Sequence, residues 1–153
     1  MKFADFICFD AVTPRLEATD RDSAIGELVA ALKKTGNLGK IKSQDLIDSI
    51  ITRENEASTG IGKGVAVPHV KHEGIDKVVA VVGLSLDGID FSSLDKQPVY
   101  TVILLVSPAS DPDKHLRAME KIFKNLQKDD FRKFLRQAQT VAEIKEAIVD
   151  HDV

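Results

Sequence analysis

Two long apolar segments constrain the fold of this chain more than any other feature. Residues 78–86 and 99–106 are rich in β-branched residues and almost continuously apolar, as strands buried on both faces are. Both are far shorter than the roughly 18 residues that a membrane span requires. Helical patterns flank the pair along the chain, two before it and two or three after it. This order predicts an α/β fold in which a mixed sheet carries helices on both faces.

Helix starts are indicated by capping residues that precede apolar positions at helical spacing. The first predicted helix covers about 22–35 after Asp20 or Asp22, and the second begins at Ser43. After the apolar strands, a helix begins at Asp111-Pro112 and another covers about 129–137. The last helix runs from the capping box Thr140–Glu143 to about 149. Residues 6–18 are expected to be extended, and Asp87-Gly88 is expected to form the turn between the two apolar strands.

Composition narrows the class of protein. The 153 residues are expected to form a single domain over 1–153. A net charge of −3, from 21 basic and 24 acidic residues, argues against nucleic-acid binding by bulk phosphate attraction. The single cysteine, Cys8, excludes a disulfide framework and a multi-cysteine metal site. Asp5 and Asp10 interrupt any signal-peptide core, so we expect a cytoplasmic protein without membrane insertion.

A glycine-rich segment, residues 58–64, is expected to be a loop, because three glycines in five residues weaken a helix or a strand. It matches neither a Walker A loop, since Gly64 follows Gly62-Lys63, nor the glycine spacing of a dinucleotide site. After it comes a short strand, 65–67, which Pro68 stops. The segment is therefore interpreted as backbone that closely approaches a ligand and leads to His69.

Two histidines are candidates for chemistry. His69 follows a strand end, and His115 lies about four residues into a helix whose positive N-terminal end favours an anion. Strand ends and helix N-termini share one edge of an α/β sheet, so the two side chains are expected to meet there. For each histidine alone, an ordinary surface residue is the alternative.

Two further patterns carry competing interpretations. His69 and His72, joined by His115 or Asp111, would make a metal site, but the zinc-helix motif His-Glu-x-x-His is absent and the segment is expected to be loop. No metal is therefore predicted. Arg53-Glu54 is interpreted either as a solvated ion pair or as an arginine that serves a phosphoryl group.

The stretch from Arg53-Glu54 through the glycine segment to Pro68-His69 resembles the signature of the mannitol/fructose-type enzyme IIA domain (EIIA type-2), including its nitrogen-regulatory relatives. This domain is a component of the bacterial phosphoenolpyruvate-dependent phosphotransferase system. The likeness continues through residues 88–91, 95–99 and 102–106 to His115-Leu116. It implies a mixed five-stranded sheet flanked by helices.

The resemblance also implies roles for individual residues. His69 would be the catalytic phosphoryl acceptor, His115 would stabilise the phosphoryl group, and Arg53 would line the site. Backbone N–H groups of the glycine segment are the expected binders of phosphoryl oxygens, namely those at Ser58, Thr59, Gly60, Gly62 and Gly64. No cofactor, metal or nucleotide is then required.

The implied activity is phosphotransfer between protein histidines. The expected donor is an HPr-like phosphocarrier, and the expected acceptor is an enzyme IIB in sugar uptake or, in a signalling role, a regulated protein. The alternative is a binding module derived from this fold that is no longer phosphorylated. Many family members have glycine after the active histidine, whereas Val70 stands here, and we expect its side chain to adjoin the docking surface and narrow partner choice.

Overall fold

Strand β5 (Val99–Pro108) lies at the centre of a five-stranded mixed sheet in the computed structural model, which describes residues 1–152. The last residue of the predicted domain, Val153, lies outside the described residues. The other strands are β1 (Gly60–Gly62), β2 (Val65–Ala66), β3 (His69–His72) and β4 (Val79–Ile89). The helices are α1 (Phe3–Phe6), the 3-10 helix η1 (Phe9–Ala11), α2 (Arg21–Lys34), α3 (Ser43–Glu56), α4 (Pro112–Leu126), α5 (Asp129–Gln137) and α6 (Val141–His151).

The two apolar segments form the central antiparallel pair, β4 and β5. On its other edge β5 pairs in parallel with β2 and then with β3, which follow one another along the same side. Residues 102–106 of β5 are fully buried. The expectation of strands covered on both faces is confirmed, and the sheet is mixed, as the order of elements predicts.

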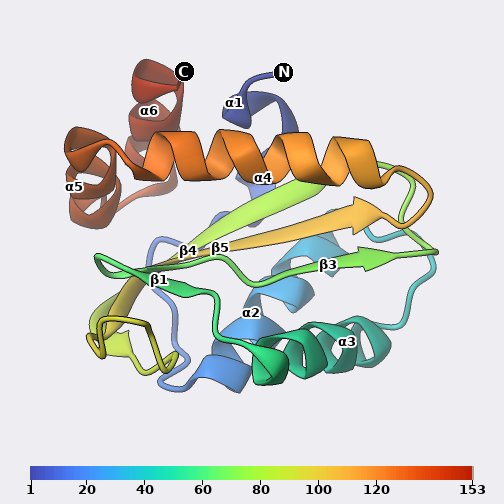
Figure 1. Ribbon diagram of the computed structural model, residues 1–153. Helices are drawn as coiled ribbons and strands as arrows, with labels where there is room; N and C mark the ends of the chain where they lie inside the picture. Colours follow the sequence, from blue (N-terminus) through green and yellow to red (C-terminus); the bar gives the residue numbers. More distant parts are fainter. Residues whose placement is uncertain (153) are drawn as a thin grey trace.

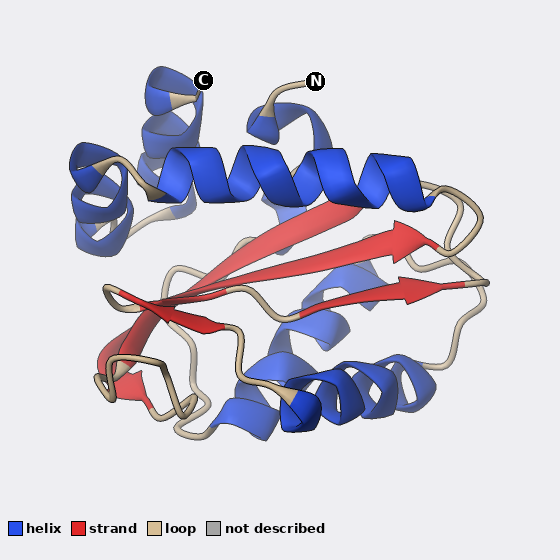
Figure 2. Cartoon of the chain, in the orientation of Figure 1, coloured by secondary structure: helices blue, strands red, loops and turns tan. Residues whose placement is uncertain are grey.

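Helices cover both faces of the sheet (Figure 1). Helices α2 and α3 lie against one face, while α4 crosses the other with α5 and α6 beside it (Figure 2). Within residues 1–152, no helix is both long enough and apolar enough to cross a membrane.

The capping residues begin the helices that the sequence predicts. Asp20 accepts a hydrogen bond from the Ser23 backbone N–H at 2.8 Å, and Thr140 Oγ1 accepts one from Glu143 N–H at 3.1 Å. Each bond satisfies an N–H group that has no partner within its helix. The predicted bounds 22–35 and 129–137 fall within one residue of α2 and α5, although α5 starts without a side-chain cap.

Two local predictions are wrong. The segment 6–18 is not uniformly extended, because it includes η1 and pairs with β4 through isolated bridges at Ile7 and Thr13 rather than as a continuous strand. Asp87-Gly88 is not the turn between the long strands. It lies inside β4, where the register shifts, and Gly88 has a φ of +91°. A Cβ atom at Gly88 would lie 2.8 Å from the Pro98 side chain. Glycine is therefore needed here for close packing and not because the chain reverses its direction.

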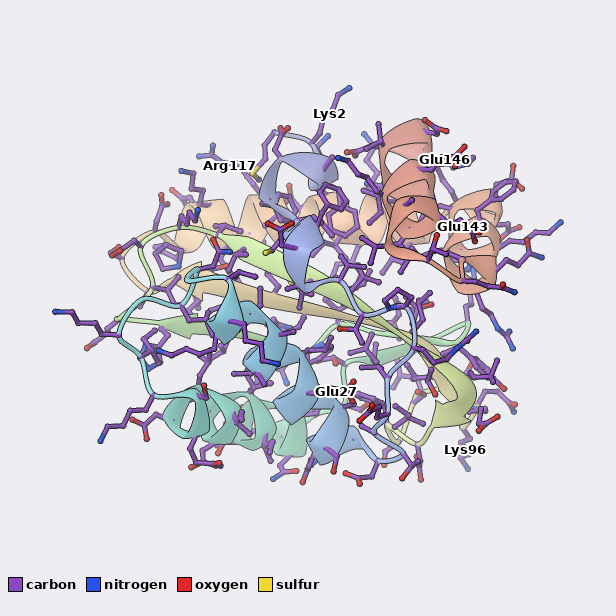
Figure 3. All side chains as sticks on the ribbon, turned by 180° about the vertical axis from the view of Figure 1, so that it is seen from behind. Lys2, Glu27, Lys96, Arg117, Glu143 and Glu146 are labelled. Atoms are coloured by element: carbon purple, nitrogen blue, oxygen red, sulfur yellow. The ribbon has the colours of Figure 1, made fainter. Side chains whose placement is uncertain are left out.

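The two ends of the chain are joined by a carboxylate. Asp152 accepts backbone N–H groups of the first helical turn at Phe3 (3.2 Å) and Ala4 (2.8 Å), and Asn125 of α4 donates to the same carboxylate at 3.4 Å. Figure 3 shows α1 beside α4 and α6, with Lys2 and Glu146 pointing away from them into solvent. A residue at the C-terminus therefore caps the N-terminal helix.

Asp152→Ala is expected to lower the free energy of unfolding by about 1 kcal/mol, because it removes the acceptor for two N–H groups at a helix start. Asp150→Ala is the matched control, since it removes an exposed carboxylate from the same region. Urea unfolding of both variants measures the difference. Equal stability of the two variants would contradict a capping role for Asp152.

Candidate functional site

His69 begins β3 immediately after a break between β2 and β3 at Val67-Pro68. Its Nδ1 atom lies 2.8 Å from the Val67 carbonyl oxygen. A carbonyl oxygen only accepts hydrogen bonds, so the proton of the neutral ring is on Nδ1. The lone pair is then on Nε2. His69 is partly exposed, and this unprotonated nitrogen is the nucleophilic atom of the ring.

His115 lies in the first turn of α4. Asp111 caps this helix by accepting from Lys114 N–H at 3.2 Å, and Pro112 occupies the first helical position. The His115 Nδ1 atom is 2.8 Å from the hydroxyl oxygen of Ser107, which is fully buried near the end of β5. The strand therefore orients the imidazole of the following helix.

The structure brings His69 and His115 together at the edge that the sequence indicates. Their ring centroids are 5.5 Å apart, with the ring planes inclined by 45°. Because β3 and β5 run in parallel with His69 opposite Leu105, their carboxyl ends approach the N-terminus of α4 (Figure 1). A tetrahedral group on His69 would thus lie beside the first turn of α4.

Burial and nearby positive charges lower the pKa of both imidazoles, which favours the neutral rings. Burial is the main cause that lowers the pKa of His69. The hydrogen bond to Val67 and the charge of Glu54 oppose this effect, while the charges of Arg53 and Lys71 add to it. The pKa of His115 is lowered to about 4, first by burial and then by His69 and Lys71. Neutral rings supply one lone pair and one N–H each.

The Arg53-Glu54 pair does not form a solvated ion pair, so that interpretation is wrong. Glu54 is only 2% exposed, and its carboxylate accepts from Thr59 N–H at 2.6 Å and from the Thr59 hydroxyl at 2.7 Å. Arg53 donates instead to the Ala57 carbonyl at 2.9 Å. Arg53 is close enough to His69 to affect its pKa, so the end of α3 contributes a cation to the site.

The glycine segment is not a loop throughout. Gly60–Gly62 forms β1 and pairs antiparallel with β2, and the hairpin turn includes Gly62 and Gly64 at positive φ. A Cβ atom at Gly60 would lie 2.9 Å from the Ser93 Cα atom. Pairing and close packing therefore account for these glycines.

The structure places the residues of this segment at different distances from His69. The Thr59 carbonyl accepts from Val67 N–H at 3.2 Å, and Ser58 donates to the Phe91 carbonyl at 2.5 Å, so Ser58 and Thr59 support the strand that precedes His69. The hairpin turn points the other way. Five extended residues from Gly64 to His69 span roughly 16 Å, so Gly62 and Gly64 are not brought to the imidazole.

The segment after His69 is a strand, not the predicted loop, and this separates His69 from His72. Side chains alternate between the two faces of a strand, so residues three apart point in opposite directions. His72 Nδ1 instead accepts from Gly74 N–H at 3.0 Å. No group of three or more histidine, cysteine, aspartate or glutamate side chains within residues 1–152 is arranged to hold a metal ion.

Val70 is partly buried and packs against the core, with its side chain on the face of β3 opposite that of His69. Two other residues of the site were missed from the sequence. For Arg53-Glu54 the sequence left a solvated pair and a phosphoryl-binding arginine open and gave no sign that Glu54 is buried, and Ser107 is a single hydroxyl near the end of an apolar strand.

Comparisons with known proteins place the chain in a family. Residues 6–151 match the family described as phosphoenolpyruvate-dependent sugar phosphotransferase system, EIIA 2, and the chain belongs to this family. A fructose-specific EIIABC component from Bacillus subtilis is 31% identical over 152 residues, which are 99% of this chain and 24% of that protein. The chain thus spans about a quarter of that relative's length.

Nitrogen regulatory proteins are also among the similar proteins. One from Bradyrhizobium diazoefficiens is 31% identical over 139 residues, covering 91% of this chain and 89% of the relative. The crystal structure of nitrogen regulatory protein IIA-Ntr from Neisseria meningitidis superposes with a TM-score of 0.86 at 20% identity, covering 95% of this chain and 97% of that one. The fold is therefore that of the EIIA proteins.

The low pKa of His115 predicts a pH-dependent stability. The pKa of an unfolded histidine is about 6.5, whereas burial lowers the pKa of His115 in the folded protein to about 4. Between these values the unfolded chain binds the extra proton, so stability falls as the pH drops from above 6.5 toward 4. His115→Gln is expected to lose less stability than the wild type over this range, as measured by urea unfolding at about pH 7 and about pH 4.5.

The same titration followed by NMR of the histidine ring protons gives a direct check. A His115 ring that titrates near its ordinary value would contradict the burial argument, as would an unchanged loss of stability in the variant.

Proposed function

We propose that His69 is a phosphoryl carrier that accepts a phosphoryl group on Nε2 from an HPr-like phosphocarrier and passes it to a second protein. The observation that carries this proposal is the 2.8 Å hydrogen bond from Nδ1–H to the Val67 carbonyl, which leaves Nε2 with its lone pair. The lowered pKa of His69 supports the same state, because a protonated ring has no nucleophilic nitrogen.

The transfer step needs no other covalent chemistry from the protein. The lone pair of His69 Nε2 attacks phosphorus in line as the bond from phosphorus to the donor nitrogen breaks, and the electron pair of that bond stays on the donor. The reverse step returns the group to a donor or delivers it to an acceptor. Positioning and charge stabilisation then account for most of the rate.

Arg53 and His115 are the proposed stabilising groups. The Arg53 cation is near His69, and guanidinium groups bind phosphoryl oxygens well because of their planar donor geometry. When the Ser107 hydroxyl donates to His115 Nδ1, the remaining ring proton is on Nε2 and available to a phosphoryl oxygen. Ser58, Thr59 and Gly60 would act by fixing the strand before His69 rather than through the distant hairpin turn.

The surface around His69 is suited to transient protein docking. Leu116, directly after His115, is 58% exposed, and Lys71 is exposed on the same face of β3 as His69. A small apolar area with a charged rim is typical of short-lived complexes. The name of the B. subtilis relative, EIIABC component, supports an enzyme IIB as acceptor. The nitrogen regulatory relatives support a signalling role by the same phosphorylated form.

We expect His69→Ala to abolish phosphorylation, since it removes the only proposed acceptor atom. The protein is incubated with phosphoenolpyruvate, enzyme I and HPr, and intact mass spectrometry detects an acid-labile gain of one phosphoryl group. His72→Ala is the matched control and should be labelled like the wild type. Labelling of the His69 variant, or no labelling of the wild type, would overturn the proposal; the second result favours a non-phosphorylated binding module.

His115→Ala is expected to be labelled on His69 but to exchange the phosphoryl group about 10²–10³-fold more slowly, the usual cost of removing one donor to a transition state. Single-turnover transfer from purified phospho-HPr measures the rate. Ser107→Ala should show a smaller decrease, because it disturbs only the orientation of the ring. If the His115 variant transfers the phosphoryl group at the wild-type rate, His115 is an ordinary histidine on the helix surface.

A further inference from the structure

A strongly basic cavity lies at the end of the molecule away from His69. It has a volume of about 460 Å³ and is lined by residues of the β1–β2 hairpin turn, the start of β5 and helix α5. Figure 1 shows the hairpin tip below α5, at the opposite end of the sheet from the start of α4. Four cationic side chains line it: Lys63, Arg132, Lys133 and Arg136.

Cationic side chains outnumber acidic ones in the lining of this cavity. Asp129 is the only acidic residue that lines it, and it pairs with Arg132, which also donates to the Leu126 carbonyl at 2.5 Å. Lys63, Lys133 and Arg136 make no ion pair among residues 1–152. Like charges held together repel one another, and three unpaired cations in a chain of net charge −3 mark a place suited to a multiply charged anion.

Two of the cations are held in position before any ligand binds. The guanidinium carbon of Arg136 lies 3.6 Å from the centroid of the Tyr100 ring, so one face of the guanidinium group is against the ring. Within residues 1–152 no hydrogen bond from Arg136 is found, so its edge N–H groups can donate to a ligand. Arg132 is fixed by Asp129 and the Leu126 carbonyl. Groups that are already ordered lose less entropy on binding a ligand.

Lys63 occupies a backbone conformation that disfavours lysine. Its φ is +58°, between two glycines that also have positive φ, and its N–H donates to the Asp95 carboxylate at 3.0 Å. Glycine or asparagine adopts this conformation at lower cost, and residues in such conformations cluster at functional sites. Here the costlier residue places a cation at the cavity.

A second cavity adjoins the first. It measures about 230 Å³, shares Lys63 and Arg132 with the basic cavity, and is otherwise lined mainly by Ile61, Phe123 and Leu126. A ligand that extended from one cavity into the other would meet cations at one end and apolar side chains at the other. This combination fits a small molecule that carries a phosphate group on a less polar body.

We propose that the basic cavity binds the phosphate group of a small, soluble phosphate ester, at a site separate from His69. Phosphate fits better than a single carboxylate, because it carries up to two charges and accepts paired hydrogen bonds from an arginine. The site is hollow rather than flat, and the protein has a negative net charge. Both features favour a soluble ligand over an anionic membrane surface. This function is additional to phosphoryl transfer and does not depend on it.

The test uses the full chain and two probes, inorganic phosphate and pyrophosphate, at constant ionic strength. Backbone amide shifts are expected to change at the hairpin turn and in α5, with saturable binding of pyrophosphate at a Kd of about 1 mM or tighter. Arg136→Gln and Lys133→Gln should each weaken binding severalfold, and the double variant at least tenfold. Lys40→Gln is the control, because it removes one exposed cation outside the cavity.

Several results would overturn the proposal. These are shifts confined to the surroundings of His69 and His115, equal loss of affinity in Lys40→Gln, or binding of acetate as tight as that of phosphate. Binding of vesicles containing phosphatidylglycerol that requires Arg136, without saturable binding of pyrophosphate, would assign the surface to a membrane. The His69→Ala variant should bind pyrophosphate as tightly as the wild type does. The binding test therefore stays valid even if His69 turns out not to carry a phosphoryl group.

Discussion

The burial of β5 on both faces is the constraint on which the rest of the structure depends. Its backbone groups have no water to bind, so they must pair with strands on both edges. Strand β4 supplies one edge, and β2 and β3 together supply the other. The apolar side chains require helices on each face. Because β5 ends just before α4, the same constraint places the first turn of a helix beside β3, the strand that His69 begins.

The interruption of strand pairing at Pro68 determines the hydrogen bonding of the His69 imidazole. A single uninterrupted strand would direct the Val67 carbonyl into the ladder of hydrogen bonds, but proline has no N–H to continue that ladder. The Val67 carbonyl accepts from the imidazole instead, and the ladder resumes with Leu105 N–H donating to the Pro68 carbonyl at 3.0 Å. A local defect in pairing thus sets which nitrogen of His69 bears the proton.

The features that could be predicted from sequence are those with local causes. Caps such as Asp111 and Thr140 determine helix starts, and continuous apolar character identifies β4 and β5. The meeting of His69 and His115 follows from a general rule about sheet edges. Each of these inferences depends on a short window of residues or on the order of elements.

The features that could not be predicted depend on partners distant in the sequence. Gly60 has to be glycine because the chain at Ser93 packs directly against it, and Glu54 is buried because Thr59 folds back over it. The basic cavity combines Lys63 with Arg136, which are separated by most of the sheet and α4 along the chain. Neither helical periodicity nor a short motif records such contacts.

The carboxylate of Asp152 also determines how this unit connects to anything attached to it. Both chain ends lie at α1 and α6, on the side of the sheet covered by α4 (Figure 1). A linker fused to either end would leave from the same region, and one short peptide would close the backbone into a ring. A module joined at either end would therefore attach beside α1 and α6 rather than at β3, the strand that His69 begins.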